Sequence, residues 1–189
     1  MKYLMVNSSI AGTKTKILMD EVNSRLTAKT DASDAVQRVE LKEKTMVFSD
    51  GRHFEDYTGD TAEVIAQVMA ADVLIFGVPT YQASVPASLK NLFDLLPKAA
   101  FKHKTVSFVV TAGSSKHYLV MEYQLKPILA FMKANIVSNY VFAEDRDFSS
   151  GELVNDEVRY RLDTLVDDTV SLAESYSEVY QKAQDSFDF

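Results

Sequence analysis

The chain has 189 residues, of which 47% are hydrophobic and 25% are charged. This composition is typical of one compact globular domain and excludes disordered, collagen-like and low-complexity proteins. The sequence has no cysteine, which excludes disulfide bonds, thiolate nucleophiles and cysteine-ligated metal clusters. Any redox chemistry must therefore come from a bound cofactor.

The net charge of −7 is unevenly distributed. Residues 144–189 hold 13 acidic and 4 basic side chains, so the rest of the chain is close to neutral. An acidic sum gives no electrostatic footprint for nucleic acid. The apolar runs at residues 3–6 and 73–79 are too short for a signal peptide or a membrane span. We therefore expect a cytoplasmic protein without nucleic-acid or membrane partners.

Short apolar segments rich in β-branched residues alternate with segments of helical periodicity. The expected strands are residues 3–6, 36–41, 73–78, 106–111 and 136–142. The third begins with Val73, Leu74, Ile75 and Phe76, an unbroken apolar run that favours a parallel strand covered on both faces.

The helical stripes between these strands run from Ile17 to Leu26, Val64 to Met69, Leu89 to Leu96, Leu125 to Met132 and Val158 to Tyr180. We expect the second helix to be capped within residues 60–63. Pro127 should kink or interrupt the fourth. The last stripe predicts a C-terminal helix over about residues 153–183, with its acidic side chains on a solvated outer face.

This alternation predicts an α/β fold in a single domain spanning residues 1–189. We expect a doubly wound, three-layer sandwich around a five-stranded parallel sheet, with the flavodoxin-like strand order 2-1-3-4-5. Ligands in such folds bind outside the carboxyl ends of the strands, at the point where the strand order reverses. The candidate site therefore lies in the loops after strands 1, 3 and 4.

The first of these loops, residues 7–15, is rich in hydroxyl groups and ends at a helix N-terminus. Backbone N–H groups there favour an anion, and Ser8, Ser9, Thr13 and Thr15 are candidate donors to a phosphate. Ordinary helix capping is the alternative interpretation. The sequence has neither the dinucleotide-binding nor the P-loop glycine pattern.

The other two loops have the features of a site for a flat heterocycle. The second lies between Pro79 and Pro86, and its backbone groups and aromatic ring are suited to a ring edge. The third loop comprises residues 111–117, where Gly113 permits close approach of the backbone to a ligand. The candidate binding residues in these loops are Pro79, Thr80, Tyr81, Gln82, Ser84, Thr111, Ala112, Gly113 and Ser114.

Residues 79–97, PTYQASVPASLKNLFDLLP, resemble the PxYxxS…LKxxxDLLP segment of the NAD(P)H-dependent FMN reductases. The resemblance is greatest to the branch that supplies reduced flavin to alkanesulfonate monooxygenases, and it covers roughly residues 1–145. Ser8, Thr13 and Thr15 match hydroxyl positions of the family's phosphate loop. The glycine and the arginine of that loop are replaced here by Asn7 and Ile10.

The resemblance implies an FMN-binding enzyme that transfers a hydride from NADPH or NADH to FMN. The isoalloxazine would lie over the second and third loops and the phosphate in the first. The flavin carries the chemistry, so no catalytic side chain is expected. His117 and Tyr123 are the only auxiliary candidates near the ring, and helix packing or a subunit contact is the other interpretation of each. No metal site is expected, because the three histidines are scattered.

The resemblance also implies a homodimer or homotetramer and a flavin-dependent monooxygenase as partner. The candidate contact face of the fourth helix consists of Leu119, Met121, Tyr123, Leu125, Ile128 and Phe131. Three alternative functions remain at this stage: a quinone or azo-compound reductase, a flavodoxin-like FMN electron carrier, and a flavin-binding protein that has lost its activity.

Overall fold

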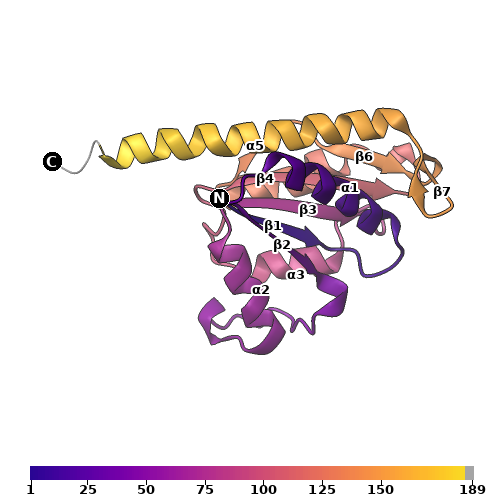
Figure 1. The fold of residues 1–189 in the computed structure, drawn as a ribbon. Coiled ribbons are helices and arrows are strands. Elements are labelled where there is room, and N and C mark those ends of the chain that lie inside the picture. Colours follow the sequence, from indigo (N-terminus) through magenta and orange to yellow (C-terminus); the bar gives the residue numbers. More distant parts are fainter. Residues whose placement is uncertain (186–189) are drawn as a thin grey trace.

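A computed structural model describes residues 1–185 of the chain (Figure 1). Its central sheet is parallel and has the order β2-β1-β3-β4-β5, which confirms the predicted topology. The strands are β1 (Lys2–Asn7), β2 (Ala35–Glu40), β3 (Val73–Pro79), β4 (Thr105–Ala112), β5 (Asn135–Ile136) and β6 (Val141–Glu144).

The predicted fifth strand, residues 136–142, is wrong as one continuous element. β5 pairs with the start of β4, and β6 pairs with its end. Between them, Ser138 and Asn139 are exposed, and the Ser138 carbonyl accepts a hydrogen bond of 2.8 Å from Lys126 Nζ. The ring of Tyr140 turns inward and stacks on Phe108. Two polar residues turned to solvent thus interrupt a strand that looks continuous in the sequence.

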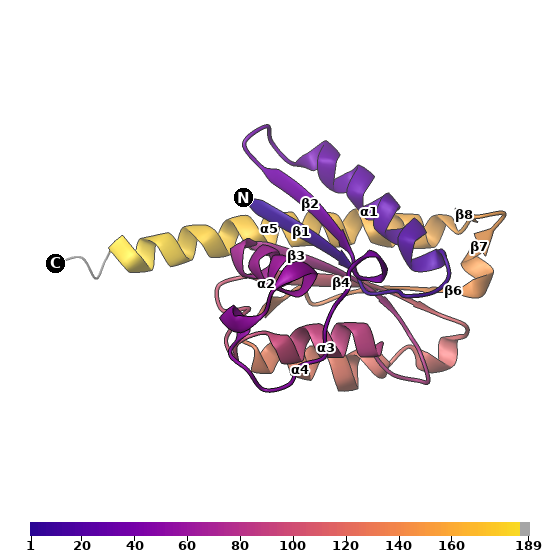
Figure 2. The same ribbon diagram turned by 90° about the horizontal axis from the view of Figure 1, so that it is seen from below.

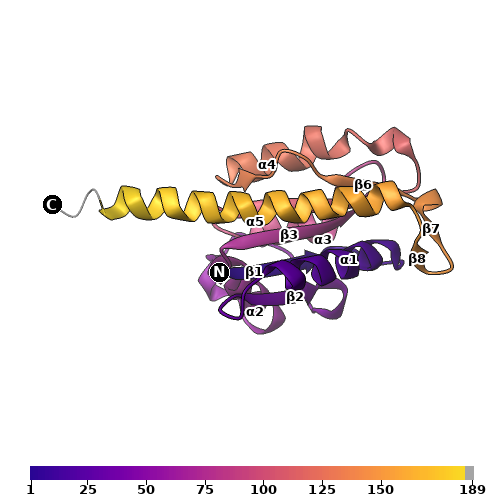
Figure 3. The same ribbon diagram turned by 45° about the horizontal axis from the view of Figure 1, so that its top comes forward.

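Helices cover both faces of the sheet. α1 (Lys14–Lys29) and α5 (Asp156–Asp185) lie on one face (Figures 1 and 3). α2 (Gly59–Ala70), α3 (Ala87–Leu95) and α4 (Lys126–Phe131) lie on the other (Figure 2). Alternate residues of β1 enter the two cores, Leu4 and Val6 on one side, Tyr3 and Met5 on the other. Burial on both faces explains why the inner strands are almost entirely apolar.

α5 lies along α1 and continues beyond the sheet (Figure 1). Ion pairs join the two helices: Arg25 Nε lies 2.6 Å from Asp163 Oδ1, and Lys29 pairs with Asp167. Part of the acidity of the C-terminal segment is therefore neutralised by α1. Among the helices of residues 1–185, none is both long and apolar enough to cross a membrane.

The predicted cap of α2 is misplaced. The helix begins at Gly59 after Thr58, and no side chain in the described part of the chain caps it. Asp60 instead accepts a hydrogen bond of 2.6 Å from the N–H of Thr45, and Thr61 accepts one of 3.0 Å from the N–H of Val47. These side chains are used to fasten the preceding long loop to α2.

The interruption expected at Pro127 is present. A π-helical segment, Met121–Leu125, precedes α4, and the N–H of Lys126 bonds to the carbonyl of Met121 five residues earlier. Pro127 follows in the first turn of α4, where its missing N–H costs nothing. Met121 and Leu125 are fully buried, so placing them on an exposed contact face was wrong, whereas Leu119, Tyr123 and Phe131 are exposed.

Candidate functional site

The three predicted loops meet around a cavity of about 290 Å³ at the carboxyl ends of β1, β3 and β4. Eight of the residues expected to bind a cofactor line it: Thr13, Thr15, Pro79, Thr80, Tyr81, Thr111, Ala112 and Gly113. Ala11, Gly12, Lys14 and Asp145 complete the lining. Parallel strands bring their carboxyl ends to one edge of the sheet, so segments a hundred residues apart share this space.

The first loop leads into the N-terminus of α1. No side chain among residues 1–185 caps this helix, and the first intrahelical bond in the turn runs from the N–H of Ile17 to the carbonyl of Thr13. The N–H groups of Lys14, Thr15 and Lys16 therefore lack an intrahelical acceptor. Together with the helix dipole, they form a site suited to an anion such as a phosphate.

The hydroxyl groups of this loop divide into two sets. Those of Ser8 and Ser9 donate to the carbonyls of Gly77 and Ala11, each over 2.7 Å, and so shape the loop itself. Thr15 Oγ1 lies 2.7 Å from Thr111 Oγ1 and joins α1 to β4. The side chain of Thr13, at the start of the helix, is exposed. Among the four candidates, Thr13 thus has the hydroxyl best placed for a ligand.

Tyr81 connects the first loop with the second. Its hydroxyl lies 3.1 Å from Ser9 Oγ, accepts a hydrogen bond of 3.2 Å from the N–H of Ala11 and donates one of 3.1 Å to the Ala11 carbonyl. The Tyr81 ring thus lines the cavity, while its hydroxyl group holds the first loop in its observed conformation. Sequence reasoning expected the ring but missed this clamp.

A tight turn follows Tyr81. Tyr81 and Ser84 exchange both backbone hydrogen bonds, and the two residues between them have positive φ, 49° for Gln82 and 56° for Ala83. This is hairpin-type geometry that normally requires glycine or asparagine. Such strain, of order 1 kcal/mol per residue, is commonly retained at ligand sites. Gln82 and Ala83 are exposed, next to Tyr81 in the cavity wall.

Two features of the cavity wall suit a ligand. Thr80 Oγ1 is buried in the wall and makes no hydrogen bond within the described residues 1–185. A Cβ added to Gly113 would meet no atom within 4 Å, so the surface of the third loop is open. Because buried hydroxyl groups are nearly always satisfied, this one fits a ligand that supplies the acceptor or donor.

An ion pair that the sequence did not reveal lies at the edge of the cavity. Lys14 Nζ is 2.7 Å from Asp145 Oδ1, and both side chains are partly exposed. The pair joins the start of α1 to the end of β6. The two residues are 131 positions apart, so only the fold brings them together.

The remaining predicted residues lie outside the lining. Ser84 donates a hydrogen bond of 2.6 Å to Gln124 Oε1, which holds the tight turn against the π-helical segment. Tyr123 is 76% exposed on that segment. His117 lies in a short 3₁₀ turn, Ser115–His117, after Ser114. The structure thus gathers the loop residues but leaves the two auxiliary candidates, His117 and Tyr123, at the periphery.

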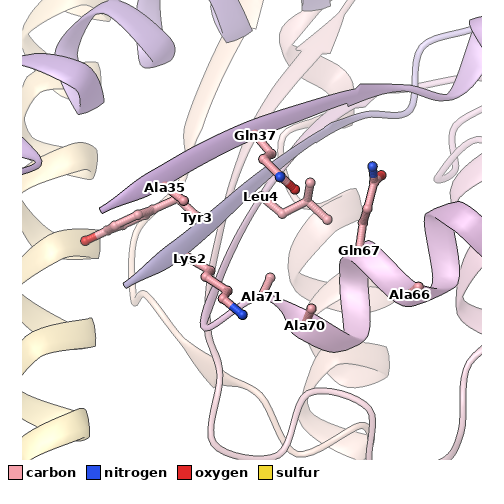
Figure 4. A pocket seen from close by; sticks show the side chains of 9 residues that line it. All are labelled: Lys2, Tyr3, Leu4, Ala35, Gln37, Ala66, Gln67, Ala70 and Ala71. Carbon is pink, nitrogen blue, oxygen red and sulfur yellow. The ribbon is translucent and has the colours of Figure 1, made fainter. Parts of the chain in front are cut away.

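A second cavity, of about 330 Å³, opens at the amino ends of the strands (Figure 4). Ala66, Ala70 and Ala71 form much of its wall, and Gln37 and Gln67 reach toward the same space from β2 and α2 (Figure 4). Its wall comes from β1, β2 and the C-terminal end of α2, which presents carbonyl groups, whereas the first cavity lies at the N-terminus of α1.

Comparisons with known proteins identify the family. A sequence model described as NADPH-dependent FMN reductase matches residues 1–148. An NAD(P)H-dependent FAD/FMN reductase of Geobacillus thermodenitrificans is 39% identical over 176 residues, covering 91% of this chain and 93% of the relative. The NADH-dependent FMN reductase SfnF of Pseudomonas putida is 28% identical over 171 residues, covering 90% and 91%.

Among solved structures, an NADH:FMN oxidoreductase (EMOB) in its apo form superimposes with a TM-score of 0.75 at 25% identity, covering 90% of this chain and 89% of the other. The match of the family model extends over well beyond half of the chain, and the Geobacillus relative is similar over almost its whole length. The chain therefore belongs to the NADPH-dependent FMN reductase family.

Proposed function

We propose that the protein catalyses hydride transfer from NADPH or NADH to FMN bound in the carboxyl-end cavity. The observation that carries this proposal is the convergence there of the N-terminus of α1, whose first N–H groups lack intrahelical acceptors, and of the buried Thr80 hydroxyl, which makes no hydrogen bond within residues 1–185. Membership of the family supports the choice of FMN.

In this proposal each loop binds one part of the flavin. The N-terminus of α1, the Thr13 hydroxyl and the Lys14 ammonium hold the phosphate. Residues 79–84 hold the edge of the ring, and residues 111–114 lie beneath it. Bound FMN supplies the hydride-accepting chemistry. The protein's own part is to orient the ring and to exclude water from one of its faces, which needs no general acid or base.

The direct test is to follow NADPH and NADH oxidation at 340 nm while the FMN concentration is varied. Saturable, FMN-dependent turnover is the expected result. Flavin binding without turnover would favour an electron carrier instead. Faster oxidation of the nicotinamide upon addition of a quinone or azo dye, at fixed FMN, would identify the acceptor reductase. Absence of FMN binding at tens of micromolar would contradict every flavin-based interpretation.

Two broader features belong to the same proposal. We infer that residues 1–189 act as one FMN-binding unit and that copies associate through the exposed Leu119, Tyr123 and Phe131. Sedimentation of a 21 kDa monomer at micromolar concentration would contradict this association. Because the chain resembles reductases of alkanesulfonate monooxygenase systems, we infer that its partner is a flavin-dependent monooxygenase. Measuring the transfer of reduced flavin between the two purified proteins would test this.

A further inference from the structure

Asn7 is a buried polar residue at the last position of β1, and both ends of its carboxamide are used. Its side-chain oxygen accepts a hydrogen bond of 3.1 Å from the N–H of Ser9. Its Nδ2 donates one of 2.7 Å to Glu40 Oε2 at the end of β2. Asn7 is 1% exposed, so these bonds have little competition from water.

The Glu40 carboxylate is in turn fixed by charge. Its side chain is 12% exposed and lies 2.6 Å from Arg38 Nη2. The other terminal nitrogen of Arg38 pairs with Asp20 on α1. A chain of contacts therefore runs from α1 through the edge strand β2 to the backbone of the first loop.

The bond from Ser9 to Asn7 is an Asx-type turn, which sets the direction in which the chain leaves β1. From there the loop runs to Gly12, with φ +76°, and into the N-terminus of α1. Tyr81 holds the same loop from the cavity side. Asn7 thus holds the first loop at the end of β1, and Tyr81 holds it from the cavity side.

We propose that the Asn7–Glu40 pair is a positioning device that sets the phosphate end of the site and thereby the preference for FMN over riboflavin. The inference rests on the proposed function, because it assumes that the first loop binds the flavin phosphate. A glycine at position 7, as in the phosphate loop that this sequence resembles, has no side chain with which to make either bond. In this chain, Asn7 in place of glycine thus serves to position the first loop.

This device acts on the first loop, which the proposed function assigns to the phosphate, and neither Asn7 nor Glu40 lines the cavity that would hold the ring. Without the Asn7 bonds the first loop must become ordered when the ligand binds, and the entropy lost in this step lowers the affinity. The loss applies to FMN, which has the phosphate, and spares riboflavin, which lacks it. A general loss of folding would weaken the binding of both ligands together.

The test compares dissociation constants for FMN and riboflavin, measured by flavin fluorescence, in the full chain and its variants. Asn7→Ala is expected to weaken FMN binding about tenfold and riboflavin binding less than about twofold. Asn91→Ala is the matched control, because the Asn91 carboxamide also makes two hydrogen bonds, both to backbone atoms, of Val47 and Ser49, and lies away from the cavity. It should change neither constant.

A double variant tests the pair itself. Asn7→Asp places a second carboxylate against Glu40 and should weaken FMN binding more than Asn7→Ala does. Adding Glu40→Gln to Asn7→Asp exchanges donor and acceptor at unchanged total charge, and should restore the FMN constant to within about threefold of the unmodified protein. Should Asn7→Ala fail to fold, the single Asn7→Asp and the double variant still decide the question.

The outcomes separate the inference from the proposed function. If the unmodified protein binds FMN and riboflavin equally well, the phosphate placement is wrong and the inference fails with it. If it prefers FMN and the position 7 variants lose affinity for both flavins in parallel, or for neither, the phosphate placement stands and the role of Asn7 is refuted. Selective loss for FMN with rescue by the double variant supports both.

Discussion

The two ends of the parallel sheet carry cavities of similar size, about 290 Å³ at the carboxyl end and 330 Å³ at the amino end, yet their walls differ in kind. The amino-end wall comes from β1, β2 and the C-terminal end of α2, where the carbonyls of Met69 and Ala71 accept hydrogen bonds from Lys104 Nζ. Its unpartnered buried atom within the described residues is Gln67 Oε1, on a flexible side chain. The carboxyl-end wall comes from loops.

Those loops carry the groups that the proposed function assigns to the flavin. They present the first N–H groups of α1, a strained turn at Gln82 and Ala83, and the Thr80 hydroxyl, which makes no hydrogen bond within the described residues. The comparison teaches that volume alone is a poor guide to a site. Polar groups that the fold holds in place but does not satisfy are the better guide.

The largest expected effect is a loss of stability, which does not distinguish the two ends of the sheet. Phe93 is 5% exposed and meets Phe76 and Phe101 edge-on, at centroid distances of 5.6 and 5.8 Å. Phe93→Ala should lower the free energy of unfolding by about 3–5 kcal/mol. Urea denaturation measures this, with the exposed Phe48→Ala as control, expected to stay within about 0.5 kcal/mol. Equal losses in both variants would contradict the assigned core.

The next effect separates the two ends. Gly113→Val puts branched carbons into open space above the third loop, so it should weaken FMN binding at least about 30-fold, or about 2 kcal/mol, with little change in Tm. Ala70→Val at the wall of the amino-end cavity should leave FMN affinity unchanged. If Ala70→Val weakened binding and Gly113→Val did not, the flavin would belong at the opposite end of the sheet.

A smaller effect is expected from single hydroxyl groups. Tyr81→Phe removes the clamp on Ser9 and Ala11 and should weaken FMN binding about fivefold, which corresponds to about 1 kcal/mol. Tyr3→Phe is the matched change at the amino end, where burial raises the pKa of Tyr3 to about 12. Isothermal titration should show no change for Tyr3→Phe. Equal affinity for Tyr81→Phe and the unmodified protein would show that the clamp is irrelevant to binding.

The smallest effect concerns the ion pair at the rim. Asp145→Asn releases Lys14 for the ligand phosphate and should tighten FMN binding by up to about threefold at low salt, with the gain disappearing at high salt. Asp163→Asn, which breaks an ion pair between α1 and α5, is the control and should have no effect on affinity. Weaker binding in Asp145→Asn would mean that Asp145 itself contacts the ligand.

Much of the fold was predictable because burial on both faces leaves a clear trace in the sequence. The strand order and the three site loops followed from apolar runs and helical stripes. The interruption of the fifth strand at Ser138 and Asn139 was not predicted. Two polar residues within an apolar run do not show whether their side chains continue the strand or turn to solvent. The cap of α2 failed for a similar reason: Asp60 and Thr61 suit capping in isolation, but the neighbouring loop uses both side chains.

At the site, residue types were predictable and their partners were not. Ser8 and Ser9 look like phosphate donors, yet their hydroxyl groups bind carbonyls of β3 and of the loop itself. The Lys14–Asp145 pair and the contact of Tyr81 with Ala11 join segments far apart in the sequence. Such pairs follow from tertiary packing, for which a single sequence carries no local signal.

The most direct test of the account is a crystal structure of the protein with FMN bound. The account predicts the phosphate at the N-terminus of α1 beside Thr13 and Lys14, with the ring against residues 79–84 and 111–114. Flavin bound in the amino-end cavity, or with its phosphate away from α1, would contradict it.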